Sequence, residues 1–203
     1  MRPRLAIAVV LILAACGSDS NSSNPPANPT LTATGSIALS ATNFTGIGKA
    51  VTCSVEGIDF GVAFAAVGAS DEAGLCSYLQ NAQDKQDAKT ITLAIFKVNP
   101  TGTTAAITTG TYPVTTNPGL STEYAFVFVS QNDAQCVATD VEGASGNIVV
   151  TSVTADRIIG TADVTLDGGG KVTGSFDAPY CDVSLPGDVC AGDIGPGETT
   201  CVP

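Results

Sequence analysis

Cysteine is the residue type whose number and positions say most about the chemistry of this chain. The 203-residue sequence contains seven cysteines and no histidine. The absence of histidine excludes a Ser-His-Asp or Cys-His catalytic arrangement and a histidine-based metal site. No two cysteines have the CxxC spacing that is common in zinc sites. A covalent role for the thiols, as disulfides or as a modified group, is therefore favoured over metal binding.

Carboxylates are the second candidate for chemistry, because a pair of them can hydrolyse a glycosidic bond without histidine. The chain lacks tryptophan and is only 5% aromatic, which argues against a sugar cleft with stacking platforms. Asp163 and Asp177 are predicted on one strand face, where they could contact calcium or a sugar. No DxDxD spacing accompanies them, so we interpret that face as solvated, and we expect no metal or other cofactor. The same interpretation applies to four acids of the C-terminal tail, namely Asp182, Asp188, Asp193 and Glu198.

The first 15 residues have the composition of an export signal. Arg2 and Arg4 precede the apolar run LAIAVVLIL at residues 5–13. This run at about 1.5 Å per residue spans roughly 14 Å, which is too short for a bilayer core of about 30 Å. A signal peptide with a cleavage site after small residues is therefore predicted instead of a transmembrane helix.

The end of this leader, Leu13-Ala14-Ala15-Cys16, resembles the lipobox of bacterial lipoprotein precursors. The resemblance implies that the Cys16 thiol receives a diacylglyceryl group and that cleavage makes Cys16 the first mature residue. Membrane lipid would then be a partner through acylated Cys16, and two or more acyl chains give stable attachment. Gly17 stands where an inner-membrane retention signal would have Asp, which favours the outer membrane. A plain signal peptide with a chance cysteine is the alternative.

Assigning Cys16 to lipid leaves an even set of cysteines. In an exported domain such a set predicts up to three disulfides. The most local closure would join Cys190 to Cys201, and the other pairings remain open among the possible connectivities. The candidates are Cys53, Cys76, Cys136, Cys181, Cys190 and Cys201.

The net charge of −11 bears on partners. A strongly acidic chain without basic patches is not expected to bind nucleic acid or an anionic lipid surface. We interpret the charge as the ordinary solubility of an exported protein.

The sequence predicts three segments and a mainly β fold. Residues 1–15 are the signal peptide, residues 16–33 the lipidated cysteine and a disordered tether, and residues 34–203 a single β-rich domain with a Gly/Pro/Cys-rich tail. Alternating apolar residues predict the strands, Pro113 predicts an edge strand and Ser70-Asp71-Glu72 predict the start of a helix over 71–84. Nine or ten strands and one short helix predict an antiparallel, disulfide-bridged β-sandwich or barrel-like domain. The strand patterns lie at 36–41, 49–56, 59–67, 90–98, 110–116, 123–130 (central), 135–141 and 146–154, followed by a hairpin at 157–176.

The hairpin is the most specific structural prediction. Apolar residues occupy even positions in both of its strands, so cross-strand partners must have an even sum. A three-residue loop at 168–170 places Leu166 opposite Val172 and Val164 opposite Gly174. Glycines in that loop allow the backbone conformations that such turns require.

A second resemblance covers perhaps 110 residues. The run GNIVVTSVTADRIIGTADVTL (146–166) followed by KVTGSFDAPYC (171–181), with LCSYLQ (75–80) and Gly110-Thr111-Tyr112, is similar to a family of predicted bacterial surface lipoproteins. That family implies no activity and no catalytic residue. We therefore expect a non-enzymatic structural, adhesion or ligand-binding surface module. The alternative is a secreted hydrolase with an all-carboxylate site.

Overall fold

The computed structural model describes residues 28–103, 105–183, 190 and 199–203. The predicted signal peptide, the residues Leu13 to Cys16 of the predicted lipobox and three acids of the tail, Asp188, Asp193 and Glu198, lie outside the described residues. The elements are β1 (Leu31–Thr34), β2 (Leu39–Ala41), β3 (Asn43–Val55), β4 (Ile58–Ser70), α1 (Leu75–Gln80), β5 (Gln83–Lys85), β6 (Lys89–Asn99), β7 (Gly110–Val114), β8 (Glu123–Asn132), β9 (Ala138–Val153), β10 (Arg157–Leu166), the 3-10 turn η1 (Asp167–Gly169), β11 (Lys171–Pro179) and β12 (Thr200–Val202).

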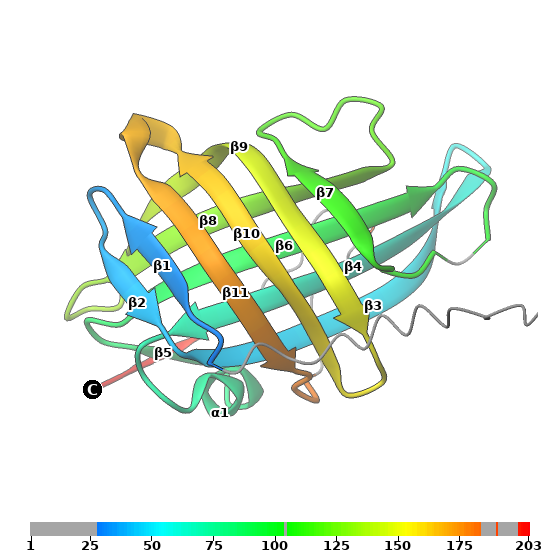
Figure 1. The fold of residues 1–203 in the computed structure, drawn as a ribbon. Coiled ribbons are helices and arrows are strands. Elements are labelled where there is room, and N and C mark those ends of the chain that lie inside the picture. The colour runs from blue at the N-terminus through cyan, green and yellow to red at the C-terminus, as the bar shows by residue number, and fades with distance from the viewer. Residues whose placement is uncertain (1–27, 104, 184–189, 191–198) are drawn as a thin grey trace, which may run out of the picture.

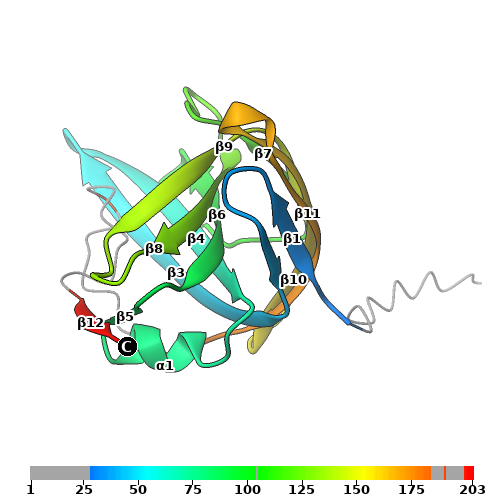
Figure 2. The same ribbon diagram turned by 90° about the vertical axis from the view of Figure 1, so that its left-hand side faces the viewer.

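Ten strands form one mostly antiparallel sheet in the order β2-β1-β11-β10-β9-β7-β8-β6-β4-β3. The sheet folds over into two layers whose strands cross: β1, β2, β11, β10 and β7 lie in front, and β8, β6, β4 and β3 lie behind (Figure 1). Seen from the end, the two layers curve toward each other (Figure 2). The predicted mainly β, antiparallel, disulfide-bridged fold with one short helix is confirmed.

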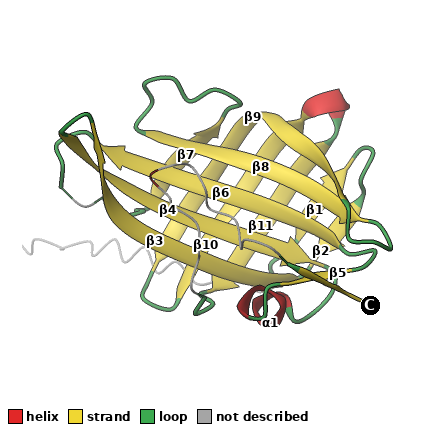
Figure 3. Ribbon diagram, turned by 180° about the vertical axis from the view of Figure 1, so that it is seen from behind, coloured by secondary structure: helices red, strands yellow, loops and turns green. Residues whose placement is uncertain are grey.

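The main core fills the space between the two layers. Strand alternation sends every second side chain inward, so Ile91, Leu93 and Ile95 of β6 are fully buried, as is Phe176 of β11. A smaller apolar cluster of Phe64, Ala94 and Phe96 lies on the outer face of the back layer. Figure 3 shows that layer from outside, with α1 at one end of it.

The first strand begins earlier than the predicted boundary of the domain. β1 covers Leu31–Thr34 and pairs with β11, and Leu31 is fully buried in the main core. Three residues of the range predicted as tether (16–33) are therefore part of the sheet. A polar composition around an isolated leucine hides this strand from sequence analysis.

The two strands predicted at 135–141 and 146–154 are one long strand, β9. Its first part pairs with β8 and its second part with β10 and β7, so β9 passes from the back layer to the front. Gly143 and Gly146 make this passage possible. A Cβ at Gly143 would lie 3.0 Å from Val114 and Val127, and Gly146 has a φ of +125° that side chains disfavour.

The hairpin has the predicted faces but a different register. Val164 pairs with Val172 and Ala162 with Gly174, which is a shift of two residues from the predicted pairing. The loop still contains three residues, but it is η1, one position earlier than predicted. The observed register places Gly160 opposite Phe176, where a Cβ on residue 160 would lie 2.5 Å from the ring. The predicted register would lose this close contact between Gly160 and the Phe176 ring.

The helix is shorter than the predicted range 71–84. α1 covers only Leu75–Gln80, because Gly74 before it has a left-handed φ of 96°. Ser70 does not begin the helix. Its hydroxyl donates to the Lys89 carbonyl oxygen (2.9 Å) and accepts from the Glu72 N–H (3.1 Å), so it ends β4 in a turn.

The prediction of an edge position for β7 is wrong. β7 lies between β9 and β8 in the sheet. However, its pairing with β8 is limited to Val114 and Ala125, so Pro113 lacks a ladder partner on that side. A proline is tolerated here for the same reason that it is tolerated at an edge.

Candidate functional site

The six candidate cysteines form three disulfides, and none of them is the local closure between Cys190 and Cys201. The pairs are Cys53–Cys190, Cys76–Cys181 and Cys136–Cys201, with sequence separations of 137, 105 and 65 residues. All three bridges therefore join distant parts of the chain. The two that involve Cys76 and Cys136 attach α1 and the small β5–β12 sheet to the main domain.

A seam lies where β3, at one end of the strand order, approaches the end of β11. β3 ends the strand order, and its link to β11 is a single parallel bridge between Gly46 and Tyr180. At this point the Cys181 N–H donates to the Gly46 carbonyl oxygen (2.7 Å), and the Tyr180 N–H donates to the Asp156 carbonyl oxygen (2.8 Å). Beyond Gly46, β3 has no further ladder partner on this side among the described residues.

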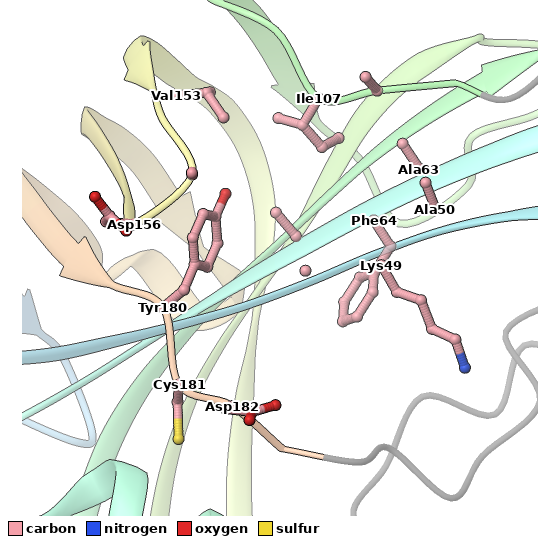
Figure 4. A pocket seen from close by; sticks show the side chains of 14 residues that line it. Lys49, Ala50, Ala63, Phe64, Ile107, Val153, Asp156, Tyr180, Cys181 and Asp182 are labelled. Carbon is pink, nitrogen blue, oxygen red and sulfur yellow. The ribbon is translucent and has the colours of Figure 1, made fainter.

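The seam opens into a groove of about 700 Å³, which we call the Tyr180 groove (Figure 4). Small residues form much of its surface, and this leaves room beside the Tyr180 ring. The ring packs against the glycines of β3, since a Cβ at Gly46 would lie 3.1 Å from it. In Figure 4 the ring points toward Val153 and Ile107. The groove is lined by Gly48, Lys49, Ala50, Ala63, Phe64, Ala65, Ala106, Ile107, Val153, Ala155, Asp156, Tyr180, Cys181 and Asp182.

The charged groups of the Tyr180 groove lie at its rim. Lys49, Asp156 and Asp182 are all exposed. Tyr180 is half-buried, and this burial raises the pKa of its hydroxyl above the ordinary value. The groove therefore offers a neutral aromatic hydroxyl among small apolar side chains. It does not offer a desolvated pair of carboxylates.

A second cavity, of about 320 Å³, lies between α1 and the outer face of the back layer, and we call it the α1 cavity. Hydroxyl and amide side chains of the sheet face α1 across it. Its lining residues are Thr45, Gly68, Ser70, Glu72, Leu75, Tyr78, Leu79, Gln83, Asp84, Lys85, Ala88, Thr90, Thr92, Ser130, Asn132, Cys136 and Ala138.

The structure does not bring Asp163 and Asp177 together. Asp163 is exposed opposite Thr173, whereas Asp177 lies opposite Ile159 at the other end of the hairpin. Asp177 forms an ion pair with Arg157 (3.0 Å), and its second carboxylate oxygen is buried without a hydrogen bond within the described structure. Asp182 lines the Tyr180 groove.

Among the described residues, no three cysteine or acidic side chains converge closely enough to hold a metal ion. The same part of the chain contains no helix with the length and hydropathy to span a membrane. Comparison with protein-family models, curated proteins and solved structures finds no match. The candidate site therefore has to be interpreted from its own residues.

Sequence analysis does not identify Tyr180 as a site residue, and of the residues that line the α1 cavity it singles out Cys136 alone for a chemical role, as a disulfide candidate. Tyr180 is adjacent to the predicted disulfide candidate Cys181, and Gly46 and Gly48 are two residues apart on β3. These two signals are visible in the sequence. Their contact spans more than 100 residues of chain, so neither signal alone indicates a groove.

Proposed function

We propose that this protein is an exported bacterial lipoprotein, anchored through acylated Cys16 to the membrane, and to the outer membrane in particular. We further propose that its domain is a non-enzymatic surface module that binds an extracellular ligand. Residues 1–16 with their lipobox support the anchor. The described part of the domain includes the Tyr180 groove and the α1 cavity, and binding is the function that this geometry favours.

One observation carries the proposal: six of the seven cysteines form three disulfides, and Cys16 is the seventh. Long-range disulfides are typical of proteins that fold in an oxidising compartment. The unassigned thiol is the one that follows Leu13-Ala14-Ala15. Its lipidation gives every cysteine of the chain a covalent role.

The anchor is tested by expressing the full chain in a bacterium that processes lipoproteins and supplying a labelled fatty acid. We expect the wild-type chain to carry the label and to sediment with membranes. Cys16→Ser should abolish both, whereas Ser20→Ala, a matched change in the predicted tether, should abolish neither. A labelled, membrane-bound Cys16→Ser chain would contradict the proposal.

The non-enzymatic assignment is tested by assaying the purified chain against a panel of glycans. We expect no turnover. If one glycan is hydrolysed and a single Asp→Asn substitution abolishes the reaction, the domain is a hydrolase with carboxylate chemistry.

A further inference from the structure

The walls of the α1 cavity are attached to the main domain by two disulfides and by strand pairing. Its roof is α1, which is joined to the end of β11 by Cys76–Cys181. Its side wall is β5, which pairs with β12, and β12 is joined to the β8–β9 turn by Cys136–Cys201. The Asn132 side chain also donates a hydrogen bond to the Lys85 carbonyl oxygen (2.9 Å). These attachments keep a space open between roof and floor.

The floor of the α1 cavity is a row of hydroxyl groups. On β6, Thr90 and Thr92 point away from the main core because Ile91 and Leu93 point into it. Thr90 pairs with Ser130 of β8. These side chains make no hydrogen bonds to other described residues, so their hydroxyls are available to a ligand as donors and acceptors.

Gly68 makes room for these hydroxyls. It lies between Thr45 of β3 and Thr92 of β6, as the cross-strand partner of both. A Cβ on Gly68 would have ordinary contacts, 3.5 Å from the Thr45 methyl and 4.0 Å from Leu75. The backbone therefore tolerates a side chain at this position, and the glycine leaves between the floor and Leu75 a space that a side chain would fill.

Thr45 is the most informative residue of the floor. Only 4% of it is exposed, yet its hydroxyl forms no hydrogen bond within the described residues. Buried hydroxyls are almost always hydrogen-bonded, because an unpaired one is costly. The Thr45 oxygen is not among the fully buried atoms that lack a partner, so its hydroxyl is open to the cavity, where water or a ligand hydroxyl can bond to it.

The charges around the α1 cavity are partly compensated. Glu72 and Lys85 form an ion pair of 2.8 Å, and the Asp84 carboxylate keeps its charge while it accepts a hydrogen bond from the Thr199 hydroxyl. An anion would find no unpaired positive charge among the described lining residues, and the carboxylate can accept hydrogen bonds from the hydroxyls of a ligand. The chemistry favours an uncharged ligand with many hydroxyl groups.

The volume of the α1 cavity and its apolar surface restrict the class of ligand further. The volume of about 320 Å³ equals that of roughly ten water molecules at about 30 Å³ each, which is close to one or two sugar rings. Tyr78, Leu75 and Leu79 of α1 face the hydroxyl floor. Although the chain lacks tryptophan, Tyr78 together with these two leucines can cover the apolar face of a sugar ring while its hydroxyls bond to the floor.

We propose that the α1 cavity binds a neutral sugar ring, as a free monosaccharide or as the end of a glycan chain. Thr45, Thr92 and Ser130 would hydrogen-bond the hydroxyls of the ring, and Tyr78 would cover its face. This inference rests on the proposed function as a ligand-binding module and names its ligand class.

The test is calorimetric titration of the full chain, with its three disulfides intact, against the methyl glycosides of glucose, galactose, mannose and N-acetylglucosamine. At least one glycoside should bind saturably. Gly68→Val fills the floor with a residue that favours strands and should abolish binding. Gly48→Val, the matched change in the Tyr180 groove, should leave binding unchanged. Thr92→Val, which removes one hydroxyl at nearly constant volume, should weaken binding about fivefold.

The circular dichroism spectrum of each variant shows that it is folded. Absence of saturable binding by all four glycosides, or equal binding by wild type and Gly68→Val, would overturn the inference. Hydrolysis of a bound glycoside would overturn the non-enzymatic assignment but retain the ligand class. Loss of the Cys16 anchor would leave calorimetric binding unaffected. Failure of the inference and failure of the proposed function are therefore distinguishable.

Discussion

The Tyr180 groove and the α1 cavity differ in what holds their walls. The groove lies between the middle of β3, the middle of β4 and the turn from β9 to β10, and both β4 and β9 contribute side chains to the main core. The α1 cavity is bounded by a six-residue helix without buried residues and by a three-residue strand. Elements this small cannot bury enough apolar surface to stay in place. Two of the three disulfides hold these elements instead. Covalent bonds therefore do here what apolar burial does for the strands of the main core.

The largest expected effect is therefore the removal of a disulfide. Cys76→Ala with Cys181→Ala opens a link across 105 residues and should lower the free energy of unfolding by about 3–4 kcal/mol. Cys181 lines the groove and Cys76 belongs to α1, so both cavities should loosen. Guanidinium denaturation measures the loss of stability.

Cys136→Ala with Cys201→Ala is the matched control, with a separation of 65 residues. It should cost a similar free energy but loosen only the α1 cavity. Hydrogen exchange separates the two variants, because the Cys181 N–H donates across the seam to Gly46 and the Tyr180 N–H donates to Asp156 beside the seam. Their exchange should accelerate in the first variant alone. Faster exchange in both variants would show that the two disulfides do not stabilise the two cavities independently.

In the Tyr180 groove, packing of the Tyr180 ring against β3 takes the place that the disulfides have in the α1 cavity. Tyr180→Ala removes a half-buried ring from Gly46 and Gly48 and should lower the free energy of unfolding by about 1–2 kcal/mol. Tyr180→Phe should leave stability unchanged, because the hydroxyl bonds to no other described residue. Equal destabilisation by both substitutions would assign the effect to the hydroxyl.

Alkaline pH should lower the free energy of unfolding through the ionisation of half-buried tyrosines, including Tyr180. Burial raises the pKa of Tyr124 and of Tyr180, so the folded chain keeps these protons when the unfolded chain loses them. Stability contributed in this way is complete below about pH 10 and falls as the pH rises through the raised pKa values. Thermal melts across this range should show a shallower fall for Tyr124→Phe with Tyr180→Phe. An unchanged slope would contradict the burial of the hydroxyls.

The smallest expected effect comes from the ion pair of the α1 cavity. The pKa of Lys85 is raised, chiefly by its hydrogen bond to Glu72 and then by the charge of that carboxylate. Glu72→Gln should lower this pKa toward its ordinary value, which NMR titration measures. Because the Lys85 ammonium is solvated, the denaturation midpoint should stay unchanged. A clear fall of the midpoint would show that the ion pair, and not the disulfides, holds the cavity wall.

The fold class is predictable from the sequence because strand alternation is a local signal. Ile91, Leu93 and Ile95 alternate with polar or outward residues in the sequence itself, and β6 follows from them. The hairpin register is not local. Its three glycines allow several loops of equal length, and the contact of Gly170 with Thr34, 136 residues earlier in the chain, selects one of them. Likewise, the hydrogen bond from Ser70 to Lys89 excludes Ser70 from the helix.

The candidate sites are less predictable than the fold. The sequence indicates which cysteines are available but not which pairs form, because each bridge depends on how the sheet folds over. Thr45, Thr92 and Ser130 are ordinary strand residues when considered singly. They become a floor only through the registers of β3, β4, β6 and β8 and through the roof that Cys76–Cys181 holds above them.

The central claim is that Cys16 is the attached residue while the other six cysteines are bridged. Mass spectrometry of the N-terminal peptide of the chain extracted from bacterial membranes tests it most directly. The account predicts a peptide that begins at Cys16 and carries a thioether-linked diacylglyceryl group. A peptide that begins elsewhere, or that carries an unmodified Cys16 thiol, would contradict the account.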